Sequence, residues 1–180
     1  EKAGDGPVLV FGFTYMIWKY FYEPLKKSGH KLHLEHGFMI HGGGWKKLAN
    51  EAVSAEQFRD GLREVCGILD VRNYYGMAEQ TGCIYMECEC GHLHASSYSD
   101  VLIRNMEDFS CCKNGTEGVI QVLTPMAWSY PGHSILTEDK GMILGEDGCP
   151  CGRKGKYIRI TGRIPKAEVR GCSDTFETGR

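Results

Sequence analysis

The chain has 180 residues, of which 42% are hydrophobic, and its formal net charge is -2 at pH 7. This length suffices for one sizeable core, and the small net charge gives no electrostatic reason to expect nucleic-acid binding. The nine cysteines are an odd number at irregular spacings, with no signal-like N-terminus, which favours reduced thiols and metal ligands in a cytoplasmic protein. Charged residues interrupt every apolar stretch too often for a membrane-spanning segment.

The first part of the chain alternates strand-like and helix-like segments. In chain order they are a strand over 8–13, a helix over 15–25, a strand-like stretch over 31–40, and helices over 45–50 and 55–69. Thr14 is placed to cap the first helix, and Ser54 or Ala55 begins the last one. This alternation predicts a mostly parallel sheet covered by helices, with ligands at the loops beyond the carboxyl ends of the strands.

The most informative motif comes next, at Tyr74-Tyr75-Gly76-Met77-Ala78-Glu79-Gln80-Thr81-Gly82. The ring of Tyr75 can stack on adenine, Gly76 lets the backbone pass close to a ligand, and Glu79 can hold Mg²⁺ beside phosphates. Aromatic–glycine turns are also common without any function, and a solvated glutamate is the plain alternative. The motif therefore points to adenylate chemistry, with an ordinary turn as its rival.

Beyond Gly82 the chain consists of short strand-like pieces separated by turns. The pieces are 83–88, 93–103, 118–124, 132–136 and 157–161. We expect them to pair antiparallel. No linker or repeat separates the halves, so residues 1–82, the α/β half, and 83–180, the β-rich half, are predicted to form one continuous unit.

Three later motifs follow in a fixed order. They are Leu136-Thr137-Glu138-Asp139, Cys149-Pro150-Cys151-Gly152-Arg153 and Thr161-Gly162-Arg163-Ile164-Pro165-Lys166-Ala167-Glu168-Val169-Arg170-Gly171. This order resembles the adenylate-forming superfamily, in the branch of phenylacetate–coenzyme A ligases and LuxE-type acyl-protein synthetases, from about Pro7 onward. The resemblance implies a mixed sheet with helices, part of that superfamily's large domain, followed by a β-rich, zinc-pinned subregion.

The same resemblance implies an ATP site. It places the loop Gly42-Gly43-Gly44 against the adenine and acyl pockets, Asp139 on the ribose hydroxyls, and Arg163 on ribose or phosphate oxygens. The plain alternatives are a helix-start loop that is no Walker motif, a turn aspartate before Gly141, and a surface arginine.

Several phenylacetate–coenzyme A ligase relatives resemble this chain in a Cys and a His that join a later Cys-Pro-Cys. Here the first segment is Cys88-Glu89-Cys90-Gly91-His92-Leu93-His94. The preferred ligand set, for one structural Zn²⁺, is Cys90, His94, Cys149 and Cys151, with Cys88 and His92 as substitutes. Strand alternation puts only every second side chain on one face, which guides this choice. Reduced cysteines that merely pack are the alternative.

Gly171-Cys172-Ser173 resembles the acyl-protein synthetase pattern in which a cysteine receives the fatty acyl group. Cys172 follows Lys166 and Arg170, and an exposed thiol near cations ionises more readily. The implied reaction is ATP- and Mg²⁺-dependent activation of a fatty acid as acyl-adenylate, then thioester formation on Cys172 and transfer to a reductase or another protein. An aryl- or acyl–coenzyme A ligase and a non-catalytic zinc-stabilised binding module remain alternatives.

The chain departs from the superfamily at one point. It contains no Ser/Thr/Gly-rich phosphate loop ending in lysine, which the superfamily carries upstream of the motifs seen here. We therefore expect this sequence to be a C-terminal half and its ATP turnover in isolation to be weak or absent.

Overall fold

The computed structural model describes residues 6–80 and 83–164, which divide into two compact units. The first unit comprises the residues up to Met77 together with Ile84–Leu93. The second comprises Ala78–Cys83 and the residues from His94 onward. The predictions for Cys172 and its neighbours lie outside the described residues.

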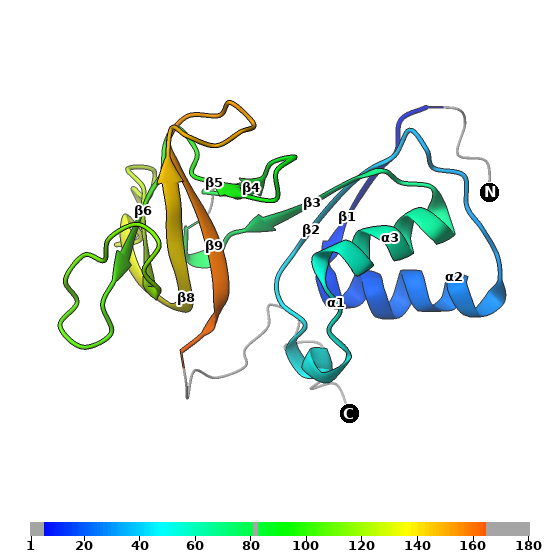
Figure 1. The fold of residues 1–180 in the computed structure, drawn as a ribbon, viewed down its shortest axis with the longest axis horizontal. Helices are drawn as coiled ribbons and strands as arrows, with labels where there is room; N and C mark the ends of the chain where they lie inside the picture. The colour runs from blue at the N-terminus through cyan, green and yellow to red at the C-terminus, as the bar shows by residue number, and fades with distance from the viewer. Residues whose placement is uncertain (1–5, 81–82, 165–180) are drawn as a thin grey trace. The chain divides into compact units, whose positions relative to one another are not determined.

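Three parallel strands form the centre of the first unit (Figure 1). They are β1 (Leu9–Phe13), β2 (Phe38–Gly42) and β3 (Asp70–Tyr75), and β4 (Tyr85–Glu87) pairs antiparallel with β3. The parallel pairing confirms the prediction from the alternating segments. The strand expected over 31–40 begins only at Phe38, because the amides of Leu32 and Leu34 donate instead to carbonyls at the end of a helix.

A single helical run follows β1 directly. It consists of α1 (Thr14–Met16), a π-helical stretch (Ile17–Tyr22) and α2 (Glu23–Ser28). The prediction that Thr14 caps this run is wrong: Phe13 is the N-cap residue, and no side chain caps the helix. Thr14 is buried, and its hydroxyl bonds the chain at the end of β2.

The next long helix, α3 (Ala55–Cys66), begins with a capping box at Ser54. Oγ of Ser54 accepts a hydrogen bond from the amide of Gln57 at 3.1 Å, and Oε1 of Gln57 accepts one from the amide of Ser54 at 2.9 Å. The helix was expected to reach Leu69. It ends earlier because Gly67 adopts φ 75°, the left-handed conformation that terminates helices.

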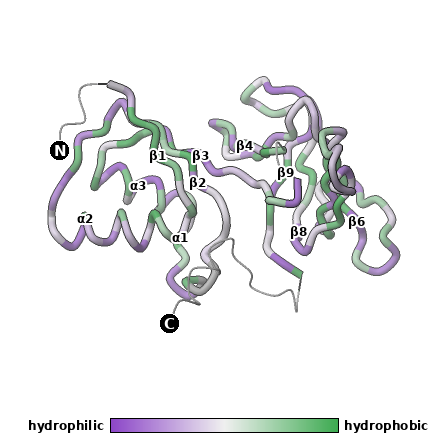
Figure 2. The backbone as a smooth tube through the Cα atoms, turned by 180° about the vertical axis from the view of Figure 1, so that it is seen from behind, coloured by the Kyte–Doolittle hydropathy of each residue, from purple (hydrophilic) through white to green (hydrophobic). Residues whose placement is uncertain are grey.

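The core of the first unit lies between the helices and one face of the parallel strands. Its buried members include Ile17, Trp18 and Tyr22 of the first helical run, Phe58, Leu62, Val65 and Cys66 of α3, and Met39 and Val71 of the sheet. Cys66 is fully buried, as its helical spacing predicted. Figure 2 shows hydrophobic colour on β1 and hydrophilic colour along α2. Among the described helices, none combines the length and apolarity needed to cross a membrane.

The second unit is built on antiparallel strands. In hydrogen-bonded order they are β6 (Asp100–Arg104), β7 (Gly118–Leu123), β8 (Ser134–Glu146) and β9 (Lys156–Arg163). Their pairing confirms the antiparallel prediction for this half. β8 is far longer than the predicted piece over 132–136, because both β7 and β9 continue to pair with its second half.

Loss of the capping box is expected to destabilise the first unit. Ser54→Ala removes the acceptor for the amide of Gln57 and should lower the free energy of unfolding by about 1 kcal/mol. Urea unfolding followed by circular dichroism measures the change. Ser54→Asp retains a capping acceptor and should stay near the parent, so equal losses in both variants would contradict the capping role.

Candidate functional site

The carboxyl ends of the parallel strands bring two predicted nucleotide-binding segments together. Phe13 of β1 is the register partner of Gly42 in β2, and Gly42 is the partner of Tyr74 in β3. The glycine loop that begins at Gly42 and the aromatic segment that ends β3 therefore lie on neighbouring strand ends. This is the edge at which ligands bind in open parallel sheets.

Gly42 is required at this edge because the ring of Tyr74 occupies the place of a side chain. A Cβ on Gly42 would lie 2.4 Å from Cε1 of Tyr74. The same ring stacks on Phe11, with centroids 5.8 Å apart. Gly43 has φ 73°, a left-handed conformation, whereas a Cβ on Gly44 would meet no atom within 4 Å. Glycine is thus needed at 42 for space and at 43 for its backbone conformation, whereas the space around Gly44 would admit a side chain.

Thr14 and His41 support the glycine loop from the helix-covered side of the sheet. Oγ1 of Thr14 donates to the carbonyls of Gly42 at 3.1 Å and Gly43 at 2.9 Å, and lies 2.9 Å from Nδ1 of His41. The hydroxyl proton faces two acceptors, so Nδ1 of His41 is the donor to Oγ1. Burial, and secondly the charge of Arg59, lower the pKa of His41 to about 4, which keeps the ring neutral at pH 7.

The rest of the aromatic motif continues from β3. Tyr75 is the last residue of that strand, and Gly76 follows it. The ring centroids of Tyr75 and Tyr85 are 5.8 Å apart. Glu79 lies in a short 3₁₀ turn, Ala78–Gln80, and is exposed. Tyr74 and Tyr75 therefore belong to a strand rather than to the turn that the sequence suggested.

In the second unit, Asp139 and Arg163 are register partners on β8 and β9. Nε of Arg163 lies 3.5 Å from Oδ1 of Asp139, and its Nη2 lies 2.5 Å from Oε2 of Glu138. Asp139 is thus a strand residue rather than the turn aspartate of the alternative interpretation. Sequence reasoning assigned Asp139 and Arg163 separate roles and did not consider Glu138, although it stands next to Asp139 in the quoted motif.

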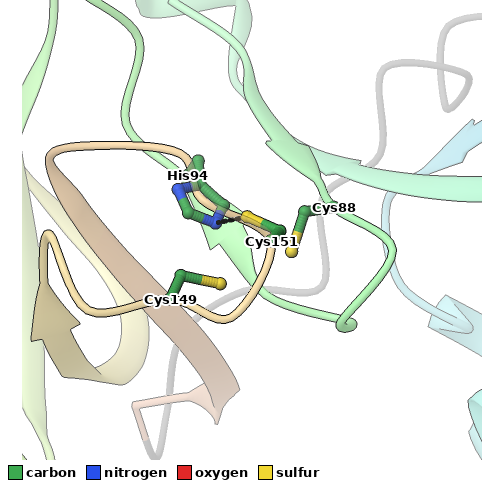
Figure 3. A group of neighbouring side chains, drawn as sticks. All are labelled: Cys88, His94, Cys149 and Cys151. Atoms are coloured by element: carbon green, nitrogen blue, oxygen red, sulfur yellow. Dashed lines mark hydrogen bonds between the residues drawn. The ribbon is translucent and has the colours of Figure 1, made fainter.

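A compact group of sulfur and nitrogen ligands lies among β5 (Leu93–His94) and the turns at 88–91 and 149–152. The side chains of Cys88, His94, Cys149 and Cys151 point toward one another (Figure 3), and their ligand atoms all lie within 4.8 Å of one another. Sγ of Cys151 is 3.4 Å from Nε2 of His94. Cys88, His94 and Cys149 are buried, and Cys151 is half-buried.

The cysteine turns have the same local form. In Cys88-Glu89-Cys90-Gly91 the Gly91 amide donates to the carbonyl of Cys88 at 2.9 Å, and in Cys149-Pro150-Cys151-Gly152 the Gly152 amide donates to the carbonyl of Cys149 at 3.0 Å. Both glycines have positive φ, 74° and 81°, which lets each turn close. The repeated Cys-x-Cys-Gly is therefore a turn that presents thiols.

The structure places Cys88 where the preferred ligand set had Cys90. Cys90 is exposed and lies outside the group, while Cys88, considered as a substitute, lies within it. The preference assumed strand alternation through Cys90, but β4 ends at Glu87. The chain turns at Cys88–Gly91, so residues two apart no longer share a face.

A family model described as acyl-protein synthetase, LuxE, matches residues 1–179. The chain belongs to this family. The match confirms the resemblance drawn from the order of the motifs. Among curated relatives are long-chain-fatty-acid–luciferin-component ligases of Vibrio harveyi, 24% identical over 142 residues, and of Aliivibrio fischeri, 24% identical over 166 residues. These alignments cover 76% and 89% of this chain but only 35% and 42% of the relatives, so the chain spans less than half their length.

Solved structures of acyl–coenzyme A ligases share the fold. A long-chain-fatty-acid–CoA ligase from Archaeoglobus fulgidus has a TM-score of 0.60 at 14% identity, covering 88% of this chain and 34% of its own. A 2-hydroxyisobutyryl-CoA ligase, solved with 2-HIB-AMP and CoA, has a TM-score of 0.68 at 17% identity, covering 88% and 36%. At these identities the likeness concerns the fold, and it confirms the predicted fold class.

Alanine substitutions at Gly42 and Gly44 test the packing of Tyr74 on Gly42. Gly42→Ala inserts a methyl group into the ring of Tyr74 and should lower the free energy of unfolding by about 1–3 kcal/mol, as overpacking does. Gly44→Ala should be nearly neutral, because its Cβ would meet open space. Thermal unfolding of both variants measures the difference, and similar melting temperatures for the two would contradict this packing.

Proposed function

We propose that this protein belongs to a ligase that activates a fatty acid with ATP and transfers the acyl group to a cysteine thioester. The family match over residues 1–179 carries the proposal. A carboxylate oxygen of the fatty acid attacks the α-phosphorus of ATP and displaces pyrophosphate, giving acyl-adenylate. The thiolate of Cys172 then attacks the acyl carbon and displaces AMP, leaving a thioester that a further acceptor can take.

The adenine side of the site is assigned to the carboxyl edge of the first unit. Tyr75 supplies a ring for stacking on the base, and Gly76 leaves room for the ligand next to the backbone. The loop Gly42-Gly43-Gly44 offers backbone close to the nucleotide. The support for these roles is the register that makes Gly42 and Tyr74 neighbours at that edge.

The ribose and phosphate roles are assigned to residues of the second unit. Asp139 can accept two hydrogen bonds from a vicinal diol, and its ion pair with Arg163 holds the carboxylate in place. Arg163 also has donors suited to ribose or phosphate oxygens. Glu79 presents an exposed carboxylate, the ligand type that Mg²⁺ prefers, and the ion would offset phosphate charge there.

A substitution at Cys172 distinguishes acyl-protein ligation from the alternatives, an acyl–coenzyme A ligase and a binding module. The full-length protein that carries this sequence, incubated with ATP, Mg²⁺ and mixed fatty acids, should gain the mass of one acyl chain, removable by hydroxylamine because it is a thioester. Intact-mass spectrometry measures the adduct, which should be lost in Cys172→Ala. The buried Cys66→Ala variant serves as the thiol control.

Other outcomes of that experiment reject the proposal in different ways. AMP formation that needs coenzyme A, with no protein adduct, would establish an acyl–coenzyme A ligase. An adduct that persists in Cys172→Ala would place the acceptor thiol elsewhere. Neither an adduct nor AMP, with zinc bound, would leave a zinc-stabilised binding module.

We propose further that Cys88, His94, Cys149 and Cys151 hold one structural Zn²⁺. Zinc takes thiolate sulfur at about 2.3 Å and imidazole nitrogen at about 2.0–2.1 Å, so the ligand atoms of a tetrahedral Cys₃His site lie about 3.5–3.8 Å apart. The ligand atoms here lie within 4.8 Å of one another, so a small contraction satisfies that geometry. A closed Cys₃His set leaves no position for a reactive water, and the ion would fasten the two turns together.

Serine substitutions distinguish this ligand set from the one preferred on sequence. Cys88→Ser and Cys149→Ser should each lose most of the bound zinc and lower the melting temperature, because three ligands remain. Cys90→Ser is the matched control and should keep about one zinc per chain. Elemental analysis of purified protein measures the content. Zinc loss in Cys90→Ser with retention in Cys88→Ser would favour the sequence-derived set, and absence of zinc in all would favour packed thiols.

The cellular setting is part of the same proposal. Nine cysteines at irregular spacings suit the reducing conditions of the cytoplasm. A protein acceptor such as a reductase would take the acyl group from Cys172. The fatty acid is the proposed substrate because the curated relatives are named for long-chain fatty acids.

A further inference from the structure

Gln80 follows Glu79 directly in the chain, but it is buried where Glu79 is exposed. Its side chain is 1% exposed, whereas Glu79 is exposed on the surface. Burying a primary amide is unfavourable unless the amide finds hydrogen-bond partners. The partners of Gln80 therefore show what holds this turn in the second unit.

The amide of Gln80 donates to two main-chain carbonyls far away in the sequence. Nε2 lies 2.9 Å from the carbonyl oxygen of Gly132 and 3.3 Å from that of Val122. Both partners can only accept, so the nitrogen rather than the oxygen must face them. Val122 lies in β7 and Gly132 lies just before β8, so one side chain ties the 78–80 turn to both.

The backbone of the turn packs at the same place. A Cβ on Gly132 would lie 2.9 Å from the carbonyl oxygen of Glu79 and 2.1 Å from the ring of Tyr130. Glycine at 132 thus permits the close approach of the Glu79 backbone. The chain next to Gly132 is also held in place, because the amide of Thr124 donates a hydrogen bond to the carbonyl of His133 at 2.9 Å.

The side-chain oxygen of Gln80 differs from the nitrogen in its hydrogen bonding. Oε1 is buried, and it has no hydrogen-bond partner within the described part of the chain. An unsatisfied buried acceptor lowers stability, and an apolar side chain of similar length would avoid that loss. What the amide contributes is therefore the pair of bonds that its nitrogen donates.

We propose that Gln80 is a positioning residue, which fixes the carboxylate of Glu79 by clamping the 78–80 turn onto the carbonyls of Val122 and Gly132. The inference rests on the proposed role of Glu79 toward Mg²⁺. The turn has only three residues, and without the clamp its backbone loses two of its attachments to the sheet. A displacement of about 1 Å at a reacting group can lower a rate by roughly 100-fold.

The test uses the full-length enzyme with Gln80→Met, which keeps the length of the side chain and removes both donors. We expect kcat/KM for ATP-dependent acyl-adenylate formation to fall roughly 10- to 100-fold. The Mg²⁺ concentration at half-maximal rate should rise roughly 10-fold, because the carboxylate no longer stays in place. Gln121→Met is the matched control: its amide bonds Ser134 on the exposed side of β7, and its Mg²⁺ dependence should match the parent.

A second measurement does not depend on the variant folding. In the parent enzyme, nuclear magnetic resonance should show the side-chain amide protons of Gln80 exchanging with solvent far more slowly than those of Gln121. Equally fast exchange would overturn the clamp.

The remaining outcomes are distinct. A Gln80→Met variant that melts earlier but keeps the parent's Mg²⁺ dependence would reduce Gln80 to a structural residue and overturn the inference. An inactive parent enzyme would reject the proposed function itself, and with it the role of Glu79. An active parent with an unaffected Gln80→Met variant would reject only the positioning role.

Discussion

The parallel register of β1, β2 and β3 is the constraint on which the first unit depends. It aligns the three carboxyl ends and sets Gly42 beside Tyr74. Because Gly42 has no side chain, the ring of Tyr74 covers it and reaches Phe11. On the other side, Thr14 bonds the carbonyls of the glycine loop and receives the proton of a neutral His41. The loop is thus held from both faces of the sheet.

The cysteine group shows how two short turns can build a site with little regular structure. Each Cys-x-Cys-Gly turn closes through a glycine of positive φ. The turn at 149–152 brings both of its thiols into the group, whereas the turn at 88–91 brings in only Cys88. Only His94 stands in a strand. Because most of the group lies outside strands and helices, a bound metal would supply cohesion that backbone hydrogen bonds supply in regular elements.

In the second unit, antiparallel pairing makes partners of residues whose roles had looked independent. Asp139 faces Arg163 across β8 and β9, and Arg163 is shared with Glu138. Gln80 joins the turn that carries Glu79 to the sheet through main-chain carbonyls. Asp139 and Arg163, both proposed to meet the nucleotide, are therefore each held by a neighbour, which limits the reorganisation that binding would require.

The amino-acid sequence by itself determined the local features and the family. The apolar run of β1, the helical spacing of Cys66 and the capping serine of α3 follow from near neighbours, and the ordered motifs identify the family. The tertiary structure decided what depends on distant partners. Thr14 donates a hydrogen bond to the glycine loop instead of capping a helix. The side chain of Gln80 donates to main-chain carbonyls some forty and fifty residues away. Cys88 rather than Cys90 joins the ligand group because a turn, invisible to strand periodicity, rotates one thiol inward and the other out.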